Sequence, residues 1–347
     1  MFHLTITKPF GFHLADGTLY TYLTGNEYED IFAAWDWNLI PGITVDYNGT
    51  SLNCTGTTHT GTQEFVGGAS DGSIGIAAMR YETPSSKALN WRKTWFFLPD
   101  DVQFVMLSRL TSTNPVPVFS VLDQRKHVGD VYVSGITSGS GNFTSVSSLW
   151  HGGVGYTFNT SNPAVTLSLQ LGNRAGSWLT LGSTNTTQEN VDIFAAWLNH
   201  TNLSQSISYA IYPATLNYSA FEAKVNATQI TSVRNDGSIS ALLDVNHQTV
   251  MIAYWETAGG SVQIPPPSGN APLTVKSTGN SLVIVDMGSW AITASDPTQT
   301  LLNITLTFTL GTGNIPAGWP STAKTNTVNI ALPQGGEAGM SVTQTLT

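Results

Sequence analysis

The sequence predicts an all-β protein, and three observations carry this prediction. Apolar and polar residues alternate with a period of two along several segments, as they do in half-buried strands. Asp-Gly pairs, which favour tight turns because glycine tolerates a positive φ, occur at residues 16–17, 71–72 and 236–237. No segment shows a sustained helical period, so we expect little helix beyond a turn near residues 219–225.

The predicted strands follow in chain order. Residues 95–107 read as two apolar strands joined by a Pro-Asp-Asp turn. Residues 165–171 alternate strictly between apolar residues and Thr, Ser or Gln, and residues 207–212 form a strand that the next proline closes. In residues 302–310 every even position is apolar and every odd position is polar. The last pattern predicts a strand with one buried face and one solvated face.

Two domains are expected, because 347 residues are long for a single domain. The alternation weakens after Pro213, and new strands begin near Ile230. We therefore place the boundary between residues 213 and 230, with a large domain over residues 1–220 and a smaller one over residues 221–347.

Composition and charge narrow the class of protein. Only 10% of the residues are charged and 41% are hydrophobic, which is typical of a folded extracellular β protein. The formal net charge is −9 with 13 Lys and Arg residues, and nucleic acid binding needs a basic surface. No stretch reaches the roughly 18 apolar residues that span a bilayer. Neither nucleic acid nor a membrane is therefore expected as a partner.

The Asn-X-Ser/Thr sites are the feature that points to secretion. Cys54 is the single cysteine, so no disulfide can form within the chain. Ten Asn-X-Ser/Thr sites are present where about five or six are expected by chance, and we expect at least eight of these asparagines to be exposed. Residues 1–9 carry no signal peptide. We expect an extracellular protein without its N-terminal part; the alternative is that Ser and Thr richness creates the sites by accident. The ten asparagines are Asn48, Asn53, Asn142, Asn159, Asn185, Asn199, Asn202, Asn217, Asn226 and Asn303.

Recognisable catalytic motifs are absent. The sequence has no nucleophile elbow, no zinc-protease helix, no phosphate-binding Gly-rich loop and no Cys/His metal spacing. The seven histidines are scattered singly, and a lone histidine is more often structural than catalytic. We expect no metal and no other cofactor.

Five segments in chain order resemble the central domain of polysaccharide lyase family 8, which contains hyaluronate, chondroitin AC and xanthan lyases. Residues 226–347 are more loosely similar to the C-terminal β domain of that family. The strongest segment runs from a Gly-Phe-His-Leu-Ala-Asp-Gly turn to a Trp-Asp-Trp-Asn stretch and a Pro-Gly-Ile-Thr turn. The five segments are residues 11–45, residues 65–79, Arg92-Lys93-Thr94-Trp95-Phe96-Phe97, Asp123-Gln124-Arg125 and Trp150-His151-Gly152-Gly153-Val154-Gly155-Tyr156.

The resemblance implies both a fold and a reaction. The fold is a large antiparallel β supersandwich like that of the galactose mutarotases, followed by a smaller β-sandwich. The reaction is β-elimination at a uronic acid: the carboxylate is neutralised, a base removes the neighbouring ring proton, and an acid protonates the leaving oxygen. The implied partner is an acidic polysaccharide, namely hyaluronan, chondroitin, xanthan or a related glucuronan.

The resemblance also implies that the catalytic Asn, His, Tyr and Arg stand on an α/α-toroid domain that these 347 residues do not contain. A supporting Glu of the family has no counterpart at Ile6-Thr7-Lys8-Pro9. We therefore expect a fragment, a mispredicted gene product or a degenerate homologue, inactive alone and without catalytic residues. The helical domain is the expected partner in the full-length protein, and the low Lys and Arg content fits a β wall whose basic partner is that domain.

Three residues near the Pro-Gly turn are candidate substrate contacts. Trp35 and Trp37 lie two apart, which places them on one face if their segment is a strand. With Asn38 they are candidates to line a sugar cleft; the alternative is core packing. Trp35 also ends the first copy of a hexapeptide, Asp-Ile-Phe-Ala-Ala-Trp, which recurs at residues 192–197.

Four further candidates lie later in the chain. Arg125 and His127 belong to a small basic group that can bind a uronate carboxylate, and the alternative is an ion pair of Arg125 with Asp123 or Asp130. Trp150 and His151 stand beside a Gly-Gly pair and are candidates for a loop at the cleft, with structural packing as the alternative.

A second basic cluster has a simpler interpretation. Lys87, Arg92 and Lys93 read as a solvated strand edge.

Three functions follow from these patterns. The first is a polysaccharide lyase whose activity is latent in these residues. The second is a non-catalytic carbohydrate-binding or assembly module. The third is a mutarotase-like or glycoside hydrolase enzyme that uses the supersandwich alone, which needs paired carboxylates or a His and Glu that the sequence does not place convincingly.

Overall fold

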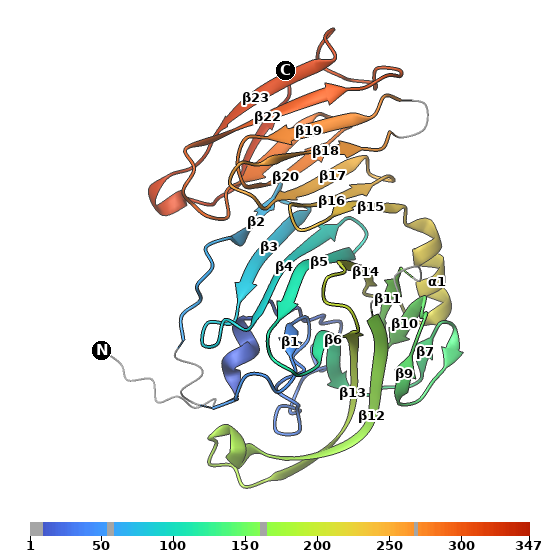
Figure 1. The fold of residues 1–347 in the computed structure, drawn as a ribbon. Coiled ribbons are helices and arrows are strands. Elements are labelled where there is room, and N and C mark those ends of the chain that lie inside the picture. Colours follow the sequence, from blue (N-terminus) through green and yellow to red (C-terminus); the bar gives the residue numbers. More distant parts are fainter. Residues whose placement is uncertain (1–9, 54–58, 160–164, 267–269) are drawn as a thin grey trace.

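The computed structural model describes residues 10–53, 59–159, 165–266 and 270–347. Within these residues the chain forms four β-sheets of five, nine, six and four strands, here called sheets A, B, C and D. The sheets are stacked in that order, with the C-terminal strands at one end and the long β12–β13 hairpin at the other (Figure 1). The single cysteine, Cys54, lies outside the described residues.

Sheets A and B are built from the first part of the chain, and their neighbouring strands run antiparallel. In spatial order, sheet A contains β1 (Thr44–Asp46), β6 (Val118–Lys126), β13 (Gln188–His200), β12 (Val165–Ser177) and β9 (Gly141–Phe143). Sheet B contains β2 (Val66–Ser70), β3 (Gly75–Glu82), β4 (Leu89–Leu98), β5 (Val102–Ser112), β14 (Ile207–Tyr212), β11 (Val154–Phe158), β10 (Ser148–His151), β7 (Val131–Val133) and β8 (Ile136–Thr137).

Sheets C and D form the smaller C-terminal sandwich, again with antiparallel neighbours. Sheet C contains β15 (Ile230–Asn235), β16 (Ile239–Asp244), β17 (Thr249–Tyr254), β20 (Ser281–Asp286), β21 (Ala291–Ser295) and β24 (Val342–Thr345). Sheet D contains β18 (Gly260–Ile264), β19 (Leu273–Ser277), β22 (Asn303–Leu310) and β23 (Thr325–Ala331).

Helix is scarce, as predicted. In the described part of the chain the single α-helix is α1 (Tyr218–Ala227), and the Asn217 side chain caps it by accepting a hydrogen bond from the Ala220 amide. Short 3₁₀ turns are η1 (Gly11–Ala15), η3 (Trp178–Leu181) and η4 (Gly335–Glu337). The prediction of an all-β protein, with a large layered domain followed by a smaller sandwich, is confirmed. The predicted division at residues 220 and 221 falls inside α1 and stays a prediction.

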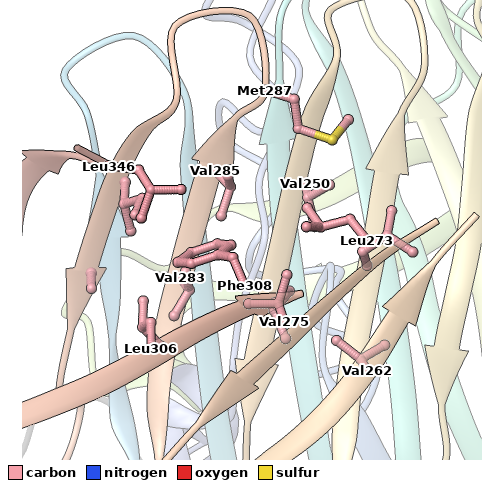
Figure 2. Close-up of a cluster of buried hydrophobic side chains, with 14 of the residues drawn as sticks. Val250, Val262, Leu273, Val275, Val283, Val285, Met287, Leu306, Phe308 and Leu346 are labelled. Carbon is pink, nitrogen blue, oxygen red and sulfur yellow. The ribbon is translucent and has the colours of Figure 1, made fainter. Parts of the chain in front are cut away.

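Each gap between neighbouring sheets is filled by its own apolar core. Figure 2 shows part of the core between sheets C and D, where Val250, Val283 and Phe308 meet. The inner strand β17 of sheet C is buried on both faces, because Met251 and Ala253 point toward sheet B while Val250 points toward sheet D. The C-terminal sandwich therefore packs on the large domain through continuous apolar contact.

Polar contacts reinforce that junction. The Arg92 guanidinium donates to Glu256 at 2.6 Å, and Arg80 donates to the carbonyl oxygen of Trp255 at 2.7 Å. The hydroxyl of Ser295 donates to the carbonyl of Gly68 at 2.9 Å. These bonds join side chains and backbone of both parts, so polar as well as apolar contacts hold the C-terminal sandwich against the large domain.

The prediction that Lys93 belongs to a solvated strand edge is wrong. Lys93 is fully buried between sheets A and B, where its Nζ donates to the Gly42 carbonyl at 2.6 Å and to the Thr44 hydroxyl at 3.0 Å. Burial lowers the pKa of Lys93 to about 7. Its neighbour Arg92 forms an ion pair with Glu256, and Lys87 alone of the three is exposed. β4 is an inner strand of sheet B, and sheet A covers the Lys93 side chain that the sequence pattern assigned to solvent.

The asparagines of the Asn-X-Ser/Thr sites lie at the surface. Nine of the ten are exposed and Asn199 is partly buried, which confirms the expectation for at least eight. In the described residues no helix is long and apolar enough to cross a membrane.

Candidate functional site

An irregular segment covers the outer face of sheet A and carries most of the candidate residues. Residues 17–43 contain almost no regular secondary structure, yet Tyr28, Ile31, Trp35 and Ile40 are buried against the strands beneath. A buried segment without strand partners needs other partners for its backbone groups. Side chains of β6 supply them.

Gln124 on β6 is the main anchor of this segment. Its carboxamide is fully buried, donates to the carbonyls of Asp36 at 2.9 Å and Leu39 at 3.0 Å, and accepts from the Asp36 amide at 2.9 Å. The Gln124 carbonyl accepts the Trp35 indole at 3.1 Å, and Arg174 donates to the Gln124 side-chain oxygen at 2.8 Å. One residue therefore fixes both the path of the segment and the orientation of Trp35.

Asp123 and Arg125 flank this anchor and form a buried ion pair. The Tyr28 hydroxyl donates to Asp123 at 2.9 Å, and Arg125 Nη2 donates to the Tyr28 hydroxyl and to the Thr21 carbonyl, both at 3.0 Å. Burial lowers the pKa of Arg125, but Asp123 opposes burial and holds it above the ordinary value. The alternative interpretation of Arg125, an ion pair with Asp123, is therefore the arrangement found. Nη1 is the one nitrogen of this guanidinium that is buried without a partner among the described residues.

Trp35 and Trp37 meet in an aromatic pocket of about 360 Å³. Their segment is not a strand, so the argument from strand spacing does not apply, but their rings touch edge to face with centroids 5.6 Å apart. Tyr20 stacks on Trp35 at 6.3 Å, and Phe32 lies edge-on to Trp35 at 4.8 Å. The pocket is lined by Phe10, Leu14, Tyr20, Phe32, Trp35, Trp37, Trp178, Leu181, Gly182 and Ser183.

The far wall of the aromatic pocket comes from the tip of the β12–β13 hairpin. Trp178 in η3 lines the pocket, and its indole donates to Glu189 at 2.8 Å. Gly176 brings the hairpin against the irregular segment, since a Cβ at this position would lie 1.9 Å from the Ala33 carbonyl oxygen. A residue more than 140 positions away therefore completes the pocket of Trp35.

His127 and His151 lie beside the Asp123–Arg125 pair, with their ring centroids 5.5 Å apart. His127 interacts with Asp192 at 3.1 Å and keeps 22% of its side chain exposed. His151 is buried, stacks on Phe194 at 4.0 Å, and its Nε2 accepts the Val128 amide at 3.0 Å. Burial lowers the pKa of His151 to about 3, so this imidazole is neutral at pH 7.

Of the seven candidate residues only Trp35 and Trp37 line the aromatic pocket, and Asn38 and Trp150 also lie apart from it. Asn38 is buried beside Asp36, and its amide donates to the Asn48 side chain at 3.2 Å. Trp150 is half-buried on β10, donates to the Thr215 hydroxyl at 2.8 Å, and points to the opposite face of sheet B from His151.

Eight of the ten residues that line the pocket were not among the candidates from sequence, and three aromatic ones show why. Tyr20 and Phe32 lie in the segment that carried the family resemblance, so their aromatic character was an available signal. Trp178 lies in no motif, and only the hairpin fold brings it to the site. In the described ranges no group of three or more His, Cys, Asp or Glu side chains is arranged to hold a metal ion.

Comparisons with known proteins agree on one family. A model of the super-sandwich domain of polysaccharide lyase family 8 matches residues 4–225, and a model of the C-terminal β-sandwich domain of that family matches residues 231–305. The chain is 28% identical to Chondroitinase-AC of Pedobacter heparinus over 341 residues, which is 96% of this chain and 45% of that protein. It is 25% identical to a polysaccharide lyase 8 family protein of Enterococcus faecalis over 89% of this chain and 22% of that protein.

Solved structures show the same fold. A chondroitinase AC lyase solved with oligosaccharides matches with a TM-score of 0.80 and 24% identity, over 96% of this chain and 47% of that one. A Paenibacillus xanthan lyase matches with a TM-score of 0.78 and 22% identity, over 97% of this chain and 33% of that one. The chain therefore spans less than half the length of these relatives.

Replacing Gln124 with leucine is expected to lower the free energy of unfolding by about 2–4 kcal/mol. The change leaves the buried Asp36 and Leu39 carbonyls without their donor while keeping a similar volume. Urea denaturation measures the loss, and the matched change at exposed Gln205 is expected to cost less than about 0.5 kcal/mol. Equal effects at both positions would show that Gln124 does not anchor the segment.

Proposed function

The chain belongs to polysaccharide lyase family 8, and from this premise we propose that it takes part in β-elimination on a polysaccharide that contains uronic acid. The single observation that carries the proposal is the match of both family domains, in order, over residues 4–225 and 231–305. The relatives named above include a chondroitinase and a xanthan lyase, which supports an acidic polysaccharide as the partner. Hyaluronan, chondroitin, xanthan and related glucuronans are the candidates.

The aromatic pocket supports contact with carbohydrate. Aromatic faces offer an apolar surface on which a sugar ring stacks, and the half-buried Trp37 and Trp178 stand at the pocket with part of each ring accessible. We retain Trp35 and Trp37 as substrate contacts, because both line the pocket. Asn38, Arg125 and His151 are assigned to holding the surface in place, because each is buried among protein partners away from the pocket lining.

His127 and Trp150 remain proposed substrate contacts. His127 keeps an accessible edge beside Asp192, at the border of the Tyr28 cluster. Trp150 is half-buried near Thr215. Its contact with substrate requires a polysaccharide that extends across the Gly152-Gly153 turn of the protein.

These 347 residues are proposed to be inactive on their own. Elimination requires a neutralised carboxylate, a base and an acid within reach of one sugar. Arg125 is paired with Asp123 and His151 is buried and neutral, so of the three only His127 keeps an accessible edge, and one imidazole does not supply all three functions. The catalytic groups are proposed to come from a helical domain, the expected partner in a full-length protein.

A non-catalytic carbohydrate-binding module is the second candidate function. The observation in its favour is the same aromatic pocket, which is preformed by the β6 anchor and needs no helical partner to exist. Binding without elimination is what such a module does.

We also propose that the protein is secreted and carries N-linked glycans. Nine exposed acceptor asparagines support the proposal, since a glycan cannot be attached to a buried side chain. Protein exported by a eukaryotic host is expected to lose mass on treatment with a peptide N-glycosidase. An unchanged mass would contradict glycosylation at these sites.

The purified 347-residue chain is expected to bind an acidic polysaccharide weakly and to release no unsaturated uronate product. Ultraviolet absorbance after incubation with hyaluronan, chondroitin or xanthan measures the product. Trp37→Ala is expected to weaken polysaccharide binding by about tenfold, because stacking on an aromatic ring is worth roughly 1 kcal/mol or more.

Two outcomes would overturn parts of this account. Steady product formation that Arg125→Ala or His127→Ala abolishes would show that the β domains carry a catalytic set. Failure of all three polysaccharides to bind would remove the carbohydrate contact itself.

A further inference from the structure

The aromatic pocket is more apolar than a surface built for bare sugar. Six of its ten lining residues are aromatic, and Leu14 and Leu181 add aliphatic surface. Of the lining side chains only Tyr20 and Ser183 carry a hydroxyl. A sugar ring presents several hydroxyls, and a hydroxyl that loses water without gaining a partner is destabilising.

The indole donors of the pocket are already used by the protein. The Trp35 indole donates to the Gln124 carbonyl at 3.1 Å, and the Trp37 indole donates to the Phe32 carbonyl at 3.1 Å. The Trp178 indole donates to Glu189 at 2.8 Å. The three rings therefore offer the pocket their faces and edges but no free N–H group.

We propose that this pocket binds an aromatic substituent carried by the polysaccharide, with Trp178 as the residue that determines specificity for it. This rests on the proposed function, because it assumes that a uronate polysaccharide lies across the pocket. The sugar chain stays at the rim, where Trp37 and Trp178 are partly exposed, and its substituent enters the space of about 360 Å³. An aromatic ring fits because the walls are ring faces that favour offset or edge-to-face packing.

The hairpin gives the pocket its selectivity. β12 and β13 pair without interruption from Val165 opposite His200 to Ser177 opposite Gln188, so the tip is held far from the body of sheet A. At this tip Trp178 turns into the pocket, while the next residue, Leu179, is 51% exposed and does not line it. Adjacent residues thus provide a matched pair, one inside the proposed site and one outside.

Two small probes isolate the substituent from the sugar. Phenyl β-D-glucuronide and methyl β-D-glucuronide share the uronate ring and differ by one apolar ring. Calorimetric titration is expected to show the phenyl compound binding at least about tenfold tighter, as apolar pockets discriminate small apolar groups by about 10- to 200-fold. Trp178→Ala is expected to reduce this ratio to below about threefold, and Leu179→Ala to leave it unchanged.

Further controls keep the outcome decisive. Leu181→Ala, which opens the same wall, is expected to lower the ratio as well, and thermal denaturation verifies that each variant is folded. Equal binding of the two probes, or a Trp178→Ala variant that weakens both equally, overturns the proposal. A chondroitin hexasaccharide titrated in parallel tests the carbohydrate contact separately, so its binding with an absent phenyl preference would reject only the aromatic substituent.

Discussion

The hydrogen bonds of the buried Gln124 carboxamide hold the site together. An irregular segment lies over sheet A with its backbone removed from water, and each unpaired carbonyl or amide there would cost about 1–3 kcal/mol. Gln124 satisfies two carbonyls and one amide of that segment, while Asp123 and Arg125 tie the Tyr28 hydroxyl and the Thr21 carbonyl to the same strand. Three consecutive polar residues of β6 thus convert a loop into a fixed surface.

That surface rests on layers of sheet that are packed against one another. Sheet B is covered on one face by sheet A and on the other by sheet C, so the inner strands have no solvated side. Lys93 and His200 lie within this stack and are linked through the Thr44 and Ser120 hydroxyls. Such buried polar contacts specify how the sheets align, and they explain why a lysine is found where the pattern suggested solvent.

Strand content could be predicted from sequence, whereas the site could be predicted only in part. Strict alternation located β22, because one buried face leaves a period of two, and two apolar runs around a turn located the β4–β5 hairpin. The repeated hexapeptide shows the limit of local sequence: residues 192–197 form an inner strand of sheet A, while the identical residues 30–35 form turns outside it. Neighbouring strands decide the conformation, not the six residues themselves. Trp178 lay beyond prediction for the same reason, since a hairpin tip reaches the pocket only after sheet A has formed.

The central claim is that the aromatic surface held by β6 is where carbohydrate binds. The ten tryptophans provide a direct test, because each indole N–H gives its own signal in a nitrogen-15 correlation spectrum. Titration with hyaluronan or chondroitin hexasaccharide is predicted to shift the signals of the half-buried Trp37 and Trp178, and to leave Trp290 and Trp319 of the C-terminal sandwich unchanged. Shifts confined to Trp290 and Trp319, or to Trp150 on sheet B, would contradict the claim.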